Sequence, residues 1–262
     1  MVFNSKKGNW IVRHKILLTI GFLAVLIIGA LLYLLIPNTY TISGRITNNF
    51  NEPVKDINLS FGDKNVTTNK NGEYQISGIN NEEAVKITIP TTYAYVSPKL
   101  AINYKEAQQK GFKVFQIQQD VKLEYNVRDF VDQTLTNMKY TRHNIIWSYL
   151  DKSSQEVFGT QDAYEKFFKA AFGVASPENN IKDYTILADK TTVREKWTSP
   201  QGIDYSNVFE VPYEETENNG SHISQIFYAI PLNNKLIMTS SYTKDKYETA
   251  KKYLIDSGYL DN

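Results

Sequence analysis

The chain contains no cysteine among its 262 residues, which excludes disulfide bridges, thiolate metal sites and lipidated cysteines anywhere in it. Histidine is also scarce, and His14, His143 and His222 lie too far apart in the sequence to predict an imidazole metal cluster. A serine nucleophile elbow, a zinc-binding His-Glu-x-x-His motif and a phosphate-binding loop are all missing. We therefore expect no metal, no cofactor and no catalytic residue, so the chain is not predicted to be an enzyme.

Acidic residues are missing from residues 1–15, which carry Lys6, Lys7, Arg13 and Lys15. The whole chain has 29 basic and 28 acidic side chains, so the part after residue 15 holds 25 basic against 28 acidic ones, a net charge of −3. Phosphate backbones are bound by concentrated basic surfaces. We expect no nucleic-acid partner.

Residues 16–36, ILLTIGFLAVLIIGALLYLLI, contain no charged side chain. At 1.5 Å per residue such a run is long enough for the roughly 30 Å hydrocarbon core of a bilayer. A cleaved signal peptide has a shorter apolar run and a small-residue cleavage site, whereas this run ends in Leu-Leu-Ile-Pro-Asn. The sequence predicts a transmembrane helix over 16–36 in contact with the lipid bilayer. The positive-inside rule makes 1–15 a cytoplasmic tail and places the rest outside a plasma membrane.

Residues 38–124 have short runs of alternating hydrophobicity that are separated by Asn, Gly and Pro. These runs predict strands over 39–47, 57–61, 73–77, 84–89 and 112–125. Their spacing, without a helical period, predicts an antiparallel β-sandwich. Between two of them lies Asn69-Lys70-Asn71-Gly72, where Asn and Gly favour a turn that folds two strands back on each other. A calcium loop aligned on Gly72 would need Asp first and Glu twelfth, where this chain has Thr67 and Gly78.

A series of short motifs in this region occurs in a known order. The motifs are Ser43-Gly44-Arg45-Ile46-Thr47, Asn51-Glu52-Pro53-Val54, residues 57–61, residues 67–74 and Ser77-Gly78-Ile79. Together they resemble the carboxypeptidase regulatory-like domain, a transthyretin-like β-sandwich that is related to the adhesin B-type repeat. The resemblance implies a spacer or docking module without catalytic activity.

Residues 126–262 begin with apolar residues at three- and four-residue spacing, which predicts a long, kinked helix over about 127–150. Further helices are expected at 153–155, after Thr160 as N-cap, and at 244–257. Strands are expected over 182–200, 203–216, 222–232 and 235–242, joined by three hairpin turns into one meander. Helices followed by long antiparallel strands describe an α+β cone, in which helices cover a curved sheet.

The stretches WSYLDKSSQ (147–155), GIDYSNV (202–208) and KLIM (235–238) are similar in order to extracytoplasmic nuclear transport factor 2-like domains. The resemblance implies a cone whose interior holds a ligand or meets a partner, and in some members an enzyme. His143 and the acids Asp162, Asp183 and Asp204 form no local motif here, so catalysis is not predicted. Most aromatic residues must fill the core, and we expect the remainder to line the mouth of the cone. The candidates for contact with a ligand or partner are His143, Trp147, Tyr164, Phe168, Trp197, Tyr205 and Phe227.

Two functions follow from this organisation. The first is a non-enzymatic, membrane-anchored extracytoplasmic scaffold, in which the sandwich is a spacer and the cone binds an envelope protein or a cell-wall component in a bacterial cell-envelope or secretion assembly. The second is a small-molecule binding protein or enzyme that uses the cone pocket. The second function requires an open pocket with His143 or an acid facing it, and a cone packed shut with aromatic side chains would exclude it.

Overall fold

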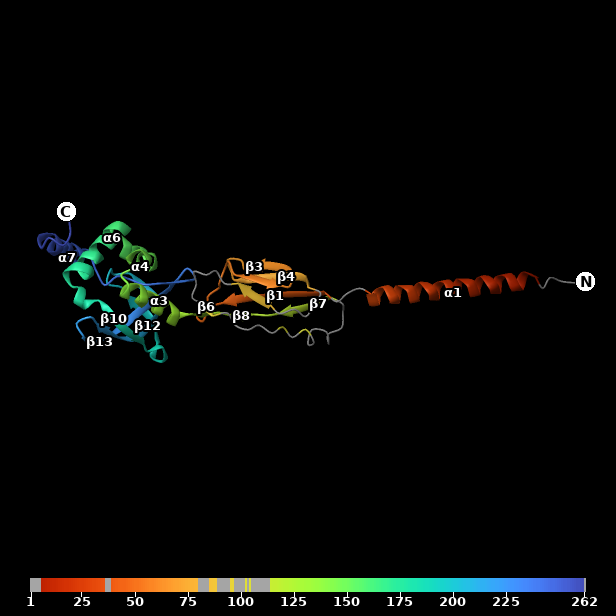
Figure 1. The fold of residues 1–262 in the computed structure, drawn as a ribbon. Coiled ribbons are helices and arrows are strands. Elements are labelled where there is room, and N and C mark those ends of the chain that lie inside the picture. Colours follow the sequence, from red (N-terminus) through yellow and green to blue (C-terminus); the bar gives the residue numbers. More distant parts are fainter. Residues whose placement is uncertain are drawn as a thin grey trace, which may run out of the picture.

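The computed structural model of the protein describes residues 6–35, 39–79, 85–88, 95–96, 102, 104 and 114–261. Three parts follow one another along the length of the molecule in Figure 1. Helix α1 (Lys6–Leu35) lies at the N-terminal end, a group of strands between residues 39 and 125 lies in the middle, and mixed helices and strands lie at the C-terminal end. We call residues 39–125 the β unit and residues 126–261 the C-terminal unit.

The prediction of a transmembrane helix over residues 16–36 is wrong. Within the described residues, no helix combines the length and the apolar character that crossing a membrane requires. The predicted fold class began with this transmembrane helix and is therefore wrong in that part. The predicted single-pass location in a plasma membrane rested on the same helix and is wrong too.

The β unit consists mainly of two sheets built around short strands. In the first, β1 (Thr39–Thr47) pairs antiparallel with β4 (Glu73–Ile79) and parallel with β7 (Val114–Gln118) and β8 (Val121–Lys122). In the second, β2 (Asn58–Phe61) lies between β3 (Lys64–Thr67) and β5 (Val85–Thr88). A short pair joins β6 (Tyr95–Val96) to β9 (Glu124–Tyr125). Alternate residues of β1 and β2 are buried in one shared core.

The Asn69–Gly72 segment is a turn, as the sequence predicts. Gly72 has a φ of 74°, and the side-chain oxygen of Asn69 accepts hydrogen bonds from the backbone N–H groups of Asn71 and Glu73 at 2.9 and 3.0 Å. The strands on either side do not pair with each other, because β3 belongs to one sheet and β4 to the other. The expected fold-back is therefore wrong, and the turn carries the chain between two sheets.

Helices form one layer of the C-terminal unit. They are α3 (Val127–Lys139), α4 (His143–Tyr149), α5 (Lys152–Phe158), α6 (Gln161–Phe168), the π-helix η1 (Lys169–Ala175), the 3-10 turns η2 (Pro177–Asn179) and η3 (Ala188–Lys190), and α7 (Lys244–Asp256). The long helix expected over 127–150 is two helices, because Thr141 adopts a φ of 53° and ends the helical path. Thr160 caps α6 as predicted, accepting a hydrogen bond from the Ala163 N–H at 3.1 Å.

A single antiparallel sheet forms the second layer. Its strands are β10 (Ile181–Ile186), β11 (Thr192–Thr198), β12 (Asp204–Glu217), β13 (His222–Leu232) and β14 (Lys235–Ile237). The long strand β12 pairs with both β10 and β11 and, on its other side, with β13. The three predicted hairpins are confirmed, since β11, β12, β13 and β14 pair in succession.

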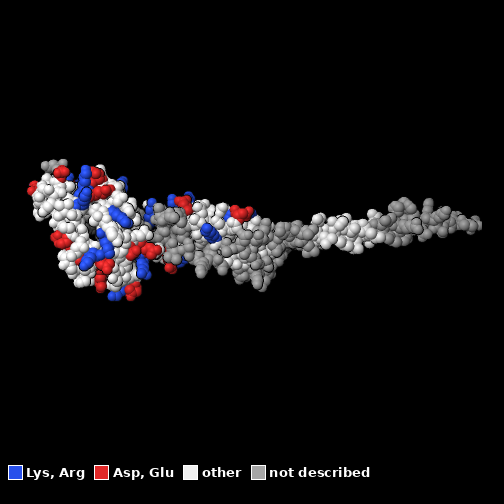
Figure 2. All heavy atoms as spheres, viewed as in Figure 1, with Lys and Arg blue, Asp and Glu red and all other residues white. Residues whose placement is uncertain are grey.

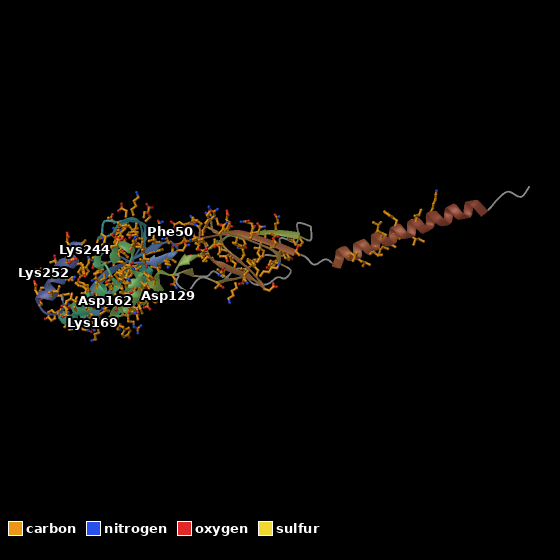
Figure 3. All side chains as sticks on the ribbon, turned by 90° about the horizontal axis from the view of Figure 1, so that it is seen from above. Phe50, Asp129, Asp162, Lys169, Lys244 and Lys252 are labelled. Carbon is orange, nitrogen blue, oxygen red and sulfur yellow. The ribbon has the colours of Figure 1, made fainter. Side chains whose placement is uncertain are left out.

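The β unit joins the C-terminal unit without a linker between them. β9 ends at Tyr125, and the next residue, Asn126, is the N-cap of α3. The ring of Phe50 lies 6.1 Å from that of Tyr125 and 5.4 Å from that of Phe209 on β12. Phe50 lies between the two units in Figure 3. One apolar core runs through the junction, because buried residues of both units belong to the same cluster.

Candidate functional site

A cavity of about 630 Å³ lies between the helices and the sheet of the C-terminal unit. A pocket of this size is in the range that holds small organic ligands. Its lining residues are Met138, His143, Ile146, Leu150, Tyr164, Phe168, Phe172, Asn179, Asn180, Ile181, Trp197, Pro200, Tyr213, Glu215, Glu217, Gln225, Ile226, Phe227, Tyr228, Met238, Thr239, Ser240 and Ser241. The walls are therefore mainly aromatic and aliphatic, with polar groups contributed by a few side chains.

His143, the first residue of α4, belongs to the helical wall. Its ring lies 6.3 Å from the ring of Tyr164 and 5.6 Å from that of Phe168, both on α6. Burial lowers the pKa of His143, although the charge of Glu165 acts in the opposite direction. The imidazole is therefore neutral at pH 7. Both ring nitrogens are shielded from solvent and have no hydrogen-bond partner within the described residues, so the ring is buried in the wall without a polar contact.

The helical wall continues from α6 directly into the π-helix η1. Phe168, the last residue of α6, stacks on Phe172 of η1 with ring centroids 5.8 Å apart and an interplanar angle of 8°. A π-helix shifts the register of side chains along a helix and is frequent at functional sites. Both stacked rings line the cavity.

The sheet wall is formed by residues of β11, β12 and β13. On β12 these are Tyr213, Glu215 and Glu217, which share one face because side chains alternate along a strand. Gln225 on β13 pairs with Tyr213, and Phe227 follows on the same face. Burial raises the pKa of Glu215, and the charge of Glu217 raises it further, while hydrogen bonds from Gln225 and Tyr213 lower it. The carboxylate of Glu215 is thus held in a fixed orientation at the cavity.

Asp151 anchors the segment that closes one end of the cavity. It caps α5 by accepting a hydrogen bond from the Ser154 N–H at 2.9 Å, and it also accepts hydrogen bonds from the hydroxyls of Ser153 and Tyr205. Burial acts to raise the pKa of Asp151, but these hydrogen bonds outweigh it and the pKa is lowered. The Ser154 hydroxyl in turn accepts from the N–H of Ser240, which lines the cavity. This network fixes the wall next to β14.

Five of the seven predicted contact residues line the cavity: His143, Tyr164, Phe168, Trp197 and Phe227. Trp147 packs on Tyr164, with ring centroids 5.4 Å apart, and belongs to the neighbouring core. Tyr205 hydrogen-bonds Asp151 and supports the wall from outside. Whether any of the seven residues contacts a ligand stays a prediction.

The polar part of the site was not predicted from the sequence. Tyr213, Glu215 and Glu217 were expected to lie in or next to a strand but were not assigned to the pocket. Their spacing of two residues was the available signal, because it places the three side chains on one face of the strand. The methionines Met138 and Met238, which also line the cavity, carry no comparable signal.

The arrangement offers few groups for catalysis or metal binding. The described residues contain no cluster of three or more His, Asp or Glu side chains that could hold a metal ion. His143 lacks a hydrogen-bonded carboxylate in the described part of the chain, so it has no partner that would orient it as a base. The walls are instead suited to enclosing an apolar body and contacting a few polar groups on it.

Comparison of the chain with protein-family models, with curated proteins and with solved structures finds no match. The resemblances to carboxypeptidase regulatory-like and nuclear transport factor 2-like domains therefore stay predictions.

Proposed function

We propose that the protein is a non-enzymatic binding protein whose C-terminal unit holds a small organic ligand in the cavity between its helices and its sheet. The observation that carries this proposal is the open volume of about 630 Å³, lined by aromatic side chains and by the unpartnered ring of His143. A cone packed shut with aromatic side chains would have excluded this function, and the cavity is open.

The β unit acts as a rigid support in this proposal. Its core is continuous with that of the C-terminal unit through Phe50, Tyr125 and Phe209. Because no linker separates the units, the cavity keeps a fixed orientation relative to the strands of the β unit. In this proposal the β unit is a spacer that supports the C-terminal unit, and the C-terminal unit binds the ligand. The expected envelope or cell-wall partner stays a prediction.

Methionine methyl groups provide a direct test of ligand binding. The chain has three methionines, and two of them, Met138 and Met238, line the cavity. We expect the ¹³C-methyl NMR signals of these two to shift saturably when 4-phenylbutan-1-ol, an uncharged probe with an apolar body, is added to the full chain. Met138→Leu and Met238→Leu assign the two signals with little change in volume.

The variant Thr239→Phe supplies the decisive comparison, because it adds a ring to the cavity wall. The probe should bind this variant at least about tenfold more weakly, since the ring removes space that the ligand needs. Tyr253→Phe is the matched control, because Tyr253 is 64% exposed on α7 and does not line the cavity. Equal shifts at both cavity methionines in the Thr239→Phe variant would overturn the proposal.

A further inference from the structure

The charged side chains of the cavity all have one sign. Within the described residues that line it, Glu215 and Glu217 are the only ones with a formal charge at pH 7, and no Lys or Arg is present. On the face of the C-terminal unit shown in Figure 2, by contrast, basic and acidic side chains are intermixed. The cavity is therefore more negative than the surface around it.

These two carboxylates have no cationic partner among the residues that the structure describes. None of the ion pairs formed by described residues includes Glu215 or Glu217. Glu217 accepts a hydrogen bond from the side-chain amide of Asn219 at 2.9 Å, and Glu215 accepts from Tyr213 and Gln225. All of these donors are uncharged, so they orient the carboxylates and leave their negative charge uncompensated.

The two glutamates also destabilise each other. They are two residues apart on the same face of β12, and burial together with the charge of Glu217 raises the pKa of Glu215. A cation placed next to both would relieve the repulsion and part of the cost of burial.

Several aromatic rings also line the cavity. Trp197 and Tyr228 are stacked with centroids 4.6 Å apart, and Tyr213 lies beside Glu215 on the same face of β12. The electron-rich faces of such rings attract cations within about 6 Å. His143 lines the same cavity with its ring, and its two ring nitrogens are shielded from solvent.

We propose that the cavity binds an organic cation, a molecule with an apolar body enclosed by the aromatic walls and an ammonium-type head next to Glu215 and Glu217. This inference rests on the proposed function and narrows it to one chemical class of ligand. The neutral donors on both carboxylates keep them oriented towards a charged group, and the apolar walls exclude competing water.

Three probes of one shape and different charge test the inference: 4-phenylbutylammonium, 4-phenylbutan-1-ol and 4-phenylbutyrate. Dissociation constants come from the methyl shifts of Met138 and Met238 in the full chain at pH 7. We expect the ammonium probe to bind at least about tenfold more tightly than the alcohol, and the carboxylate probe to bind most weakly.

The double variant Glu215→Gln/Glu217→Gln removes both charges and keeps the side-chain shapes. It should weaken binding of the ammonium probe about tenfold and leave binding of the alcohol unchanged. Glu214→Gln is the matched control, because Glu214 is an exposed residue of the same strand that does not line the cavity. This control should bind all three probes as the native chain does.

The outcomes separate the inference from the proposed function. If the alcohol binds as tightly as the ammonium probe, or if the double variant keeps the preference, the cavity is a binding site and the inference is wrong. The inference is also wrong if Glu214→Gln weakens the ammonium probe as much as the double variant does, because the effect would then be one of net charge. If no probe shifts either methionine signal, the proposed function itself fails.

Discussion

The β unit and the C-terminal unit both pack apolar side chains against their sheets, but they fill the space between their layers differently. In the β unit, two sheets share one core, and large side chains such as Leu59 and Phe61 are at most 2% exposed. Facing sheets lie about 10 Å apart, which one interdigitating layer of side chains fills. In the C-terminal unit, helices cover one sheet and leave a cavity of about 630 Å³ between the layers.

Buried polar groups with and without hydrogen-bond partners occur in both units. In the β unit, the buried hydroxyl of Thr68 donates to the carbonyl oxygen of Val54 and accepts from the Ile57 N–H, both at 2.9 Å. In the C-terminal unit, His143 has two shielded ring nitrogens without partners within the described residues. Thr68 thus has both of its polar contacts satisfied, whereas His143 has none within the described residues. The side-chain oxygen of Asn49 in the β unit is also buried without a partner in the described part of the chain, so such groups are not confined to one unit.

The largest expected effect on stability comes from adding a single methyl group to the β unit. A Cβ on Gly44 of β1 would lie 1.9 Å from the carbonyl oxygen of Gln119. This neighbour is backbone, so the chain next to β1 would have to move. We expect Gly44→Ala to lower the free energy of unfolding by about 4 kcal/mol, measured by urea denaturation.

Gly173, in the π-helix beside the cavity, provides the matched substitution. A Cβ there would meet only the Lys169 side chain, at an ordinary 3.7 Å. Gly173→Ala should therefore change the free energy of unfolding by less than about 1 kcal/mol. Similar losses for both variants would show that the two units do not differ in how tightly they are packed.

The second prediction concerns the junction between the β unit and the C-terminal unit. It tests whether the two units unfold together or independently. Phe209 is 6% exposed, and its ring contacts those of Phe50 and Tyr125. We expect Phe209→Ala to cost about 3 kcal/mol and to separate one cooperative unfolding transition into two, measured by calorimetry. Tyr253→Ala, at a position 64% exposed, should leave a single transition and cost less than about 0.5 kcal/mol. Two transitions in the native chain would contradict a rigid junction.

The third prediction tests the network that fixes the cavity wall. Asp151 accepts hydrogen bonds from Ser153, Ser154 and Tyr205, and these lower its pKa although burial opposes them. Because the pKa is lower in the folded than in the unfolded chain, Asp151 stabilises the fold above the unfolded value of about 3.9. This contribution is lost as the pH falls through the folded pKa.

Asp151→Asn should lower the free energy of unfolding by about 2 kcal/mol at pH 7 and flatten its dependence on pH below about 4. Asp183→Asn is the control, because Asp183 has a 78% exposed side chain and makes only a 3.5 Å ion pair with Lys139. An unchanged acid dependence in Asp151→Asn would show that this network does not stabilise the wall.

Regular elements with a clear pattern were predicted well from the sequence. The strands over 39–47 and 222–232 have the expected bounds, because their alternation is regular and turn residues flank them. β3 was missed, because Lys64–Thr67 has a single apolar residue and no buried face. One kinked helix was predicted where the structure has the two helices α3 and α4, because no Gly or Pro marks the chain around Thr141.

The site was predicted only in part, for a physical reason. Residue type identifies aromatic side chains as candidates, and four of them, Tyr164, Phe168, Trp197 and Phe227, line the cavity together with His143. The contact between Tyr205 and Asp151 joins residues 54 positions apart, so no local pattern reveals it. For residues 16–36 a local pattern gave a wrong prediction, because their apolar composition alone predicted a transmembrane helix that no described helix provides.

The smallest expected effect on stability is also the sharpest test of the contrast between the two units. Thr239→Phe adds a ring to a wall that borders open space, so the ring should enter the cavity without displacing its neighbours. We expect the free energy of unfolding in urea to change by less than about 1 kcal/mol, because the gain from burying apolar area offsets small adjustments of the wall. A loss comparable to that of Gly44→Ala would mean that the cavity is closed in solution. A stable Thr239→Phe variant that no longer binds the neutral probe would show instead that the volume is used for a ligand.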